Sequence, residues 1–264
     1  IARDYRLADF RRDHGPAPVL ASVHVQVGAA DPLAETAWLA AEAEAGDWPL
    51  AIVAAADLCA SDLAATLDRL AAAAGGRLRG IRQIVARHPS EDGPTAGALL
   101  ADPAFARGLA ELARRGLSFD LQLTAPLLPA AARLFAGIAG IRVALCHAGS
   151  PWDAGPAAMA RWAQDVAGFA SAVPGAVAKL SGLGMLRPAG RGLAPIADGL
   201  LAAFGPRRVL WGSNMPVDGL HRSGWGALLE EALALVPAEA RAAVFARTAA
   251  DFYRLPLPGP ARQP

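Results

Sequence analysis

Polar and ionisable side chains interrupt several aliphatic runs that are otherwise typical of buried strands. The residues concerned lie far apart along the chain: His24, Gln26, Arg82, Asp120, Gln122, His147, Lys179 and Ser181. Histidine and aspartate can transfer protons, whereas arginine and lysine can bind a carboxylate or stabilise a developing oxyanion. Burying such groups unpaired would cost on the order of several kcal/mol each. A shared, water-accessible pocket is therefore the more favourable arrangement.

Three candidates for catalysis lie at the ends of strand-like segments or shortly beyond them. His147 opens the sequence His-Ala-Gly-Ser-Pro, a turn that we expect to expose its imidazole, and it is the best candidate in the chain for a metal ligand. Asn214 and Asp218 lie in the sequence Gly-Ser-Asn-Met-Pro-Val-Asp. Asn214 cannot ionise, so it can orient a group but cannot act as a base. Asp218 can act as a base if the turn brings it back over the pocket.

Several of these residues also have a purely structural interpretation. His24 could be a core histidine whose ring is satisfied by a neighbouring carbonyl group. Asp120 could form a structural ion pair across the strands, with either Arg82 or Lys179 as its partner. Lys179 is the single lysine in a chain that otherwise uses arginine for its cations, and the two side chains are not interchangeable.

Seven short aliphatic segments with few charges are predicted to be strands that are covered on both faces. They are Val19–Val27, Leu50–Leu58, Leu78–Val85, Leu117–Leu123, Ile141–His147, Ala176–Leu183 and Arg208–Ser213. Helical patterns lie between and after them, at Pro32–Ala45, Asp62–Ala74, Ala104–Arg115, Pro129–Ala136, Pro156–Ser171, Leu193–Phe204 and Pro237–Tyr253. Because strand and helix alternate without a linker, the sequence predicts an α/β protein with a parallel sheet.

A doubly wound sheet and a (β/α)8 TIM-type barrel both fit this alternation, and the length of 264 residues and the even spacing favour the barrel. Only seven strands are visible, and Ile1–Asp13 looks like a helix that follows a strand. We therefore expect the first strand to lie upstream of Ile1. The alternatives are a complete barrel with an irregular eighth strand, and an open sheet. We expect one barrel domain over residues 1–264, with a tail at 256–264.

Alternate side chains of a barrel strand point inward and outward. This rule places together Ser22, His24 and Gln26, then Ser118, Asp120 and Gln122, and then Val177, Lys179 and Ser181. It also places His147 on the face of Val143 and Leu145. We expect the polar faces to look into the barrel near the C-terminal ends of the strands, where such barrels carry their active sites.

Composition excludes several functional classes. The net charge is +1, from 25 basic and 24 acidic residues, so a nucleic-acid-binding surface is not indicated. No apolar run approaches the ~20 residues that a bilayer-spanning helix needs. Two cysteines, Cys59 and Cys146, lie in apolar runs and favour buried free thiols in a reducing, cytoplasmic setting. The chain also lacks the glycine spacing of a phosphate loop or a dinucleotide fingerprint.

Six sequence runs carry a resemblance to a known family. They are Gly80–Gln83, Phe119–Gln122, Cys146–Pro151, Lys179–Gly184, Gly212–Asp218 and Thr248–Leu255. In this order and at this spacing they resemble the amidohydrolase-2 (amidohydrolase-related) family of TIM-barrel hydrolases, a group that includes sugar-acid and muconate-type lactonases. The resemblance extends from Ile1 to Leu255 and is carried by the ordered set, since no single run is decisive.

The resemblance implies a (β/α)8 barrel that hydrolyses a small acidic substrate, often a lactone. It also implies a His-x-His pair on the first strand, which residues 1–264 do not contain. Asn214 stands where many relatives place an aspartate that acts as metal ligand and base. This difference weakens the case for a divalent metal such as zinc or manganese, and some relatives are thought to work without one.

These observations lead to a first hypothesis of a hydrolase that opens a small acidic lactone or a similar cyclic ester. Asp218 or His147 would be the base, while Arg82 and Lys179 would bind the substrate carboxylate or the oxyanion. The remaining polar residues of the inner face would form hydrogen bonds with substrate hydroxyls: His24, Gln26, Asp120, Gln122 and Ser181. The alternatives are a decarboxylase or hydratase on the same barrel, and a non-catalytic barrel that binds a small acid. A homo-oligomer is compatible with each.

Overall fold

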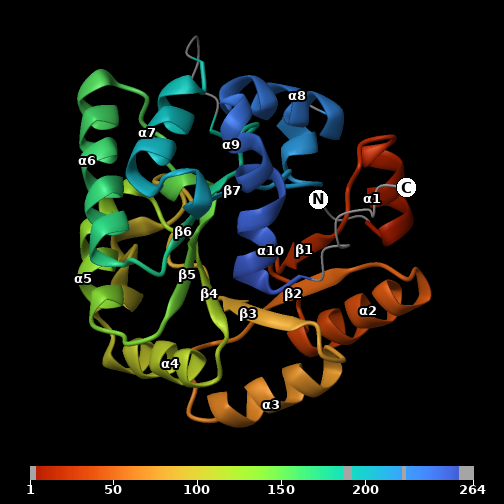
Figure 1. Cartoon of the computed structure of the whole chain (residues 1–264). Coiled ribbons are helices and arrows are strands. Elements are labelled where there is room, and N and C mark those ends of the chain that lie inside the picture. Colours follow the sequence, from red (N-terminus) through yellow and green to blue (C-terminus); the bar gives the residue numbers. More distant parts are fainter. Residues whose placement is uncertain (1–3, 187–191, 222–223, 256–264) are drawn as a thin grey trace.

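The computed structural model describes residues 4–186, 192–221 and 224–255, so the tail expected at residues 256–264 lies outside the described part. Its core is one sheet of seven parallel strands, which curls as Figure 1 shows. The strands are β1 (Ser22–Val25), β2 (Leu50–Ala55), β3 (Leu78–Arg82), β4 (Ser118–Leu121), β5 (Arg142–Leu145), β6 (Val177–Leu180) and β7 (Val209–Trp211). Each strand pairs with its neighbours in sequence order, whereas a doubly wound sheet reverses its order. The predicted α/β architecture and the seven strands are confirmed.

Ten α-helices alternate with the strands and follow the last one. They are α1 (Leu7–His14), α2 (Pro32–Ala45), α3 (Leu63–Ala73), α4 (Pro103–Arg114), α5 (Leu128–Ala136), α6 (Pro156–Ala172), α7 (Ala194–Phe204), α8 (Trp225–Leu235), α9 (Ala238–Ala242) and α10 (Thr248–Tyr253) in the described residues. The side chains of Asp31 and Asp102 cap α2 and α4, each followed by a proline at the first helical position.

Short helical turns lie in the connections between these elements. The 3-10 turns are η1 (Gly93–Thr95), η2 (Ala98–Ala101), η3 (Ala125–Leu127), η4 (Cys146–Gly149), η5 (Pro206–Arg208) and η6 (Asp218–His221), and the π-helical turn η7 spans Ala243–Arg247. Because η7 joins α9 to α10, the helix expected over Pro237–Tyr253 is one helical segment with a π-helical interruption. The sequence patterns did not predict α8, whose composition is apolar almost all around and lacks a clear amphipathic period.

The two faces of the sheet bury two different sets of side chains. The outer set packs against the helices and includes Ile52, Ile81, Phe119, Leu121, Val143, Leu145, Leu180 and Val209. The inner set consists of Ala51, Val53, Ala144, Val177 and Leu210, packed with Phe252 and Tyr253 of α10. One end of the barrel interior is therefore filled by the chain's own C-terminal helix.

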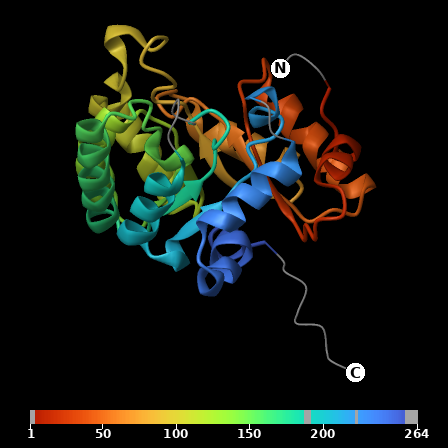
Figure 2. The ribbon, with the colours of Figure 1, turned by 90° about the horizontal axis from the view of Figure 1, so that it is seen from above.

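Strands β1 and β7 form the two edges of the sheet and do not pair with each other in the part of the chain that the structure describes. Helix α1, which precedes β1, packs against α8, which follows β7. The ring centroids of His14 and Trp225 lie 5.9 Å apart. Figure 2 shows the N-terminal helices on the side opposite α5 and α6, with the C-terminal helices between them. A strand upstream of Ile1 stays a prediction. Among the described residues no helix has the length and apolar character that a membrane crossing requires.

Candidate functional site

Strands β3, β4 and β6 bring three charged side chains together at the inner face of the sheet. Arg82 ends β3, Asp120 lies in β4 and Lys179 lies in β6, and all three are buried. Gln122 and Ser181 follow β4 and β6 on the same alternating face. The convergence expected from strand alternation is therefore seen for these five residues. They form a packed polar cluster, however, and not the open pocket that the sequence led us to expect.

The guanidinium group of Arg82 has no carboxylate partner in the described residues. Its Nη1 donates a hydrogen bond to Oε1 of Gln122 over 3.1 Å, whereas its Nε is buried without a partner. A buried guanidinium is normally paired with an anion, because desolvating an unpaired charge is costly. Arg82 is thus a candidate for binding a negatively charged group, and Asp120 forms its ion pair with Lys179 and not with Arg82.

Asp120 pairs instead with Lys179. Nζ of Lys179 contacts Oδ2 of Asp120, and the carboxylate has no solvent exposure. The hydroxyl of Tyr253 lies 2.9 Å from Oδ1 and 3.0 Å from Oδ2, so it donates to the same carboxylate. Burial and the neighbouring Asp120 raise the pKa of Tyr253, which therefore stays protonated and remains a donor.

His147 enters this cluster through a turn of left-handed backbone. The φ angles of His147, Ala148, Gly149 and Ser150 are all positive, which ends β5 at Leu145 and turns the imidazole inward. Strand alternation groups His147 with Val143 and Leu145, which pack against the helices, so the turn and not the alternation brings the imidazole into the polar cluster where we expected it. Its side chain is also buried, at 8% exposure, where an exposed ring was expected.

The imidazole of His147 is held in its neutral form. Burial, together with the positive charges of Arg82 and Lys179, lowers its pKa to about 3. Nδ1 lies 2.9 Å from Oγ of Ser181, which fixes the ring. A Cβ atom on Gly182 would lie only 2.9 Å from this same Nδ1. A neutral ring of such low basicity suits a hydrogen-bond donor or a ligand better than a general base.

Asn214 and Asp218 form a second group at the end of β7. Nδ2 of Asn214 donates to Oδ1 of Asp218 over 2.8 Å, and the backbone N–H of Gly184 donates to Oδ2 over 3.1 Å. Asp218 is buried at the start of η6. The loop after β6 lies against both groups: a Cβ atom on Gly182 would meet His147, and the N–H of Gly184 donates to Asp218.

Two predicted site residues have other positions. His24 pairs in register with Ile52, a residue of the helix-facing set, and its Nε2 lies 3.4 Å from Oε1 of Glu35 in α2. Its assignment to the inner face was therefore wrong: Val23 and Val25 occupy that face because they pack on the apolar cluster around Phe252 and Tyr253.

Gln26 lies just beyond β1 and uses both ends of its amide internally. It donates to the carbonyl group of Arg82 over 3.2 Å and accepts from the N–H of Gly28 over 2.7 Å. Gln26 thus joins the ends of β1 and β3, which leaves it less suited to binding a substrate hydroxyl, the role that we expected of it.

Tyr253 is the residue of this cluster that the sequence did not single out. It ends a helix and stands 133 positions from Asp120, so no local pattern connects the two. Two signals were available: Tyr253 lies in the run Thr248–Leu255, which carries part of the family resemblance, and the aromatic pair Phe252-Tyr253 at the end of the last helix is unusual for a surface element.

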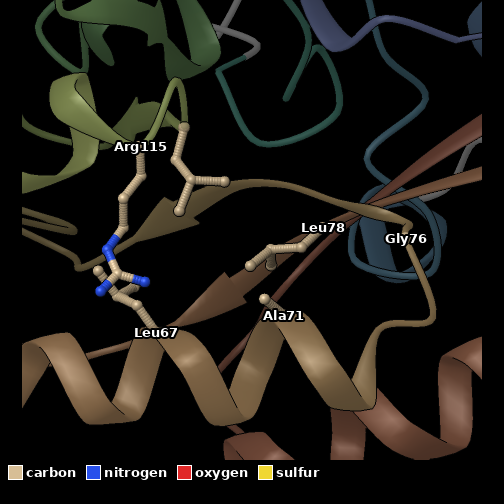
Figure 3. Close-up of a pocket in the computed structure, with 6 residues that line it drawn as sticks. Leu67, Ala71, Gly76, Leu78 and Arg115 are labelled. Carbon is tan, nitrogen blue, oxygen red and sulfur yellow. The ribbon is translucent and has the colours of Figure 1, made fainter.

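Two cavities lie away from the candidate residues. The first, of about 330 Å³, is lined by Leu67, Ala71, Gly76, Leu78, Arg115 and Leu117 (Figure 3). Its arginine is already neutralised by Asp68 and Glu111, and the guanidinium groups of Arg114 and Arg115 lower the pKa of Glu111 to about 2. The second, of about 280 Å³, lies between α2 and α3.

A metal site is not formed by the described residues alone. Within the ranges 4–186, 192–221 and 224–255, no three histidine, cysteine, aspartate or glutamate side chains lie close enough together to hold an ion. His147, the best candidate ligand in the sequence, has the hydroxyl of Ser181 and two cations as its neighbours. This donor set does not fit a divalent cation without additional ligands.

A curled parallel sheet with catalytic residue types at the C-terminal ends of its strands is the arrangement of TIM-barrel-type enzymes. A family model named Amidohydro_2, described as amidohydrolase, matches residues 2–255. The chain belongs to this amidohydrolase family and is a hydrolase of that class.

Individual relatives agree with this assignment. The chain is 34% identical to an uncharacterized protein, y4mH, of Sinorhizobium fredii, over 97% of this chain and 87% of the relative. It is also 34% identical to an L-fucono-1,5-lactonase of Burkholderia multivorans, over 80% and 74% of the two chains. An amidohydrolase crystal structure from Burkholderia multivorans with bound HEPES has 32% identity and a TM-score of 0.80, over 97% of this chain and 90% of that one. A second crystal form of that amidohydrolase holds zinc.

Proposed function

We propose that this protein is a lactonase that opens a small acidic lactone, of the sugar-acid or aromatic-degradation type, by attack of water. The observation that carries the proposal is Arg82, a buried guanidinium at the C-terminal end of a strand with no carboxylate partner in the described part of the chain. The similarity to an L-fucono-1,5-lactonase supports the reaction type. The two free thiols, Cys59 and Cys146, fit the cytoplasmic setting that we expect.

The reaction is a hydrolysis with a simple balance of atoms. The oxygen of water bonds to the lactone carbonyl carbon, and one water proton passes to a base. The ring C–O bond then breaks, and the departing alkoxide takes up a proton. The product is an open hydroxy acid, which releases one proton at neutral pH. Acid production therefore reports turnover directly.

The residues of the two groups take distinct roles in this scheme. Arg82 binds the substrate carboxylate through its free Nε. Lys179 stabilises the oxyanion that forms on the carbonyl oxygen. The neutral imidazole of His147 donates a hydrogen bond to the substrate, since its pKa of about 3 makes it a poor base. Asp218, oriented by Asn214, is the base that takes the proton from water.

A zinc-bound relative raises the question of a metal. We assign no step to one, because the described donor set does not fit a divalent cation. The roles above use only side chains of this chain.

The test is acid release from a panel of lactones, followed with a pH indicator on the full-length protein. The panel pairs five- and six-membered sugar-acid lactones with pyrones and lactones that bear a free carboxylate. We expect turnover above spontaneous hydrolysis and a preference for substrates with a free carboxylate. Absence of turnover across the whole panel would contradict the proposal.

A further inference from the structure

The C-terminal helix α10 inserts its last residue into the polar cluster from the opposite end of the barrel. Tyr253 is almost completely buried, and its ring packs against Phe252 at a centroid distance of 4.9 Å. On the inner side it meets the carboxylate of Asp120, with both oxygens within hydrogen-bond distance of its hydroxyl. Tyr253 thus supplies a polar contact to the proposed site, in addition to apolar filling.

The same tyrosine also contacts the partner of Asp120. Nζ of Lys179 lies 5.5 Å from the centre of the Tyr253 ring, and it pairs with Oδ2 of Asp120. The ammonium group is therefore held by a carboxylate and by the face of an aromatic ring. Two donors, one phenolic and one cationic, fix the carboxylate between them.

We propose that Tyr253 is a positioning residue for the lactonase reaction: by holding Asp120, it sets the place of the Lys179 ammonium group at the substrate carbonyl oxygen. This inference rests on the proposed function. Without the hydroxyl, Asp120 would keep Lys179 as its one described side-chain partner. The carboxylate, which has no access to water, would then turn toward the lysine and draw the ammonium away from the substrate.

A misplaced ammonium affects catalysis more than binding. The carbonyl oxygen carries little charge in the bound lactone and gains a full negative charge only when the oxygen of water has bonded to the carbonyl carbon. A donor held in place acts on that developing charge. Ground-state binding depends instead on Arg82, whose guanidinium group donates to Gln122. Loss of the hydroxyl should therefore lower kcat and leave KM almost unchanged.

The first experiment is the variant Tyr253→Phe, which keeps the ring and removes only the hydroxyl. We expect kcat for the best lactone of the panel to fall by about tenfold or more, with KM within about twofold. The chain offers a matched control, since its only other tyrosine, Tyr5, also donates to an aspartate: its hydroxyl lies 2.8 Å from Oδ2 of Asp13. Tyr5→Phe should change neither constant. An unchanged kcat in Tyr253→Phe would overturn the inference.

The second experiment does not depend on activity and uses the single lysine of the chain. Protein labelled with 15N-lysine should show one slowly exchanging ammonium signal from Lys179, which Tyr253→Phe shifts or broadens and Tyr5→Phe does not. A signal that is lost to rapid exchange with water in the unmodified protein would contradict a fixed ammonium, even if Tyr253→Phe failed to fold.

The two experiments separate failure of this inference from failure of the proposed function. If the unmodified protein hydrolyses no lactone but its lysine signal responds to Tyr253→Phe, the proposed function fails and the contact network stands. If lactones are hydrolysed and neither kcat nor the lysine signal responds, the positioning role fails alone.

Discussion

Arg82 is the residue on which the proposed chemistry most depends, because its free Nε has no other partner in the described structure. Arg82→Lys keeps the positive charge but loses the Nε donor that binds the carboxylate in our proposal. We expect kcat/KM for a lactone with a free carboxylate to fall about 100-fold, in keeping with about 3 kcal/mol for a charged hydrogen bond. Steady-state kinetics measure this, with the exposed Arg69→Lys as control. Equal losses for substrates with and without a carboxylate would contradict the assigned role.

His147 leads to a prediction about stability and pH. Its pKa is about 3 in the folded protein and near the ordinary 6.5 in the unfolded chain. Between these values the unfolded state binds a proton that the folded state does not. Stability is therefore lost as the pH falls from about 6.5 toward about 3, by up to about 1.4 kcal/mol per pH unit, and above pH 6.5 this histidine has no effect.

The variant His147→Asn tests this, since asparagine tolerates the positive φ of the turn and does not titrate. Urea unfolding at a series of pH values should give a shallower loss of stability on acidification than in the unmodified protein. Parallel curves for the two proteins would show that His147 is not held neutral by burial.

At the scale of elements, the loops after β5 and β6 place His147, and Gly182 makes their contact possible. Gly182 has a φ of +69° and a Cβ there would collide with Nδ1 of His147. Gly182→Ala should therefore cost about 1–2 kcal/mol in stability from backbone strain and should also reduce kcat. Gly140 is a control for the backbone strain, with a φ of +74° and open space around it. Equal kcat values in the two alanine variants would show that the contact with His147 is unimportant.

Strand alternation predicted part of the site because the strands that carry it are regular. Asp120 and Lys179 were assigned to the inner face from their own strands, and the structure pairs them. The same rule failed for His24, since nothing local fixes which of the two faces of β1 packs on α10. It failed for His147 because a left-handed turn ends the strand two residues early. No local pattern connects Tyr253 with Asp120, because the two residues are 133 positions apart.

At the scale of the whole molecule, α10 fills one end of the barrel interior and packs against the proposed site from that end. Phe252 packs on the inner faces of the strands and under the guanidinium group of Arg142, 4.7 Å from its ring centre. Phe252→Ala should lower the free energy of unfolding by roughly 3–5 kcal/mol, as for other buried phenylalanines. The exposed Leu220→Ala should change it by less than about 0.5 kcal/mol. Similar urea midpoints for both variants would contradict the role of α10 as a core element.

The sequence predicted the order and parallel arrangement of the strands, because each βα unit is read locally and such units follow one another in a barrel. The packing inside the barrel could not be predicted in this way, because it joins residues of β1, β7 and α10, which are distant in the chain. For this reason the structure has a buried polar cluster where we expected an open pocket. Ion pairs and hydrogen bonds between the strands satisfy most of the polar groups of this cluster.

The most direct test of the account is a crystal structure of the protein with the hydroxy-acid product of its best lactone. We expect a product carboxylate on Nε of Arg82, with a second product oxygen at Nζ of Lys179 and the ring of His147 alongside. A product bound elsewhere, for example in the cavity beside Arg115 or on the helix-facing side of the sheet near His24, would contradict it.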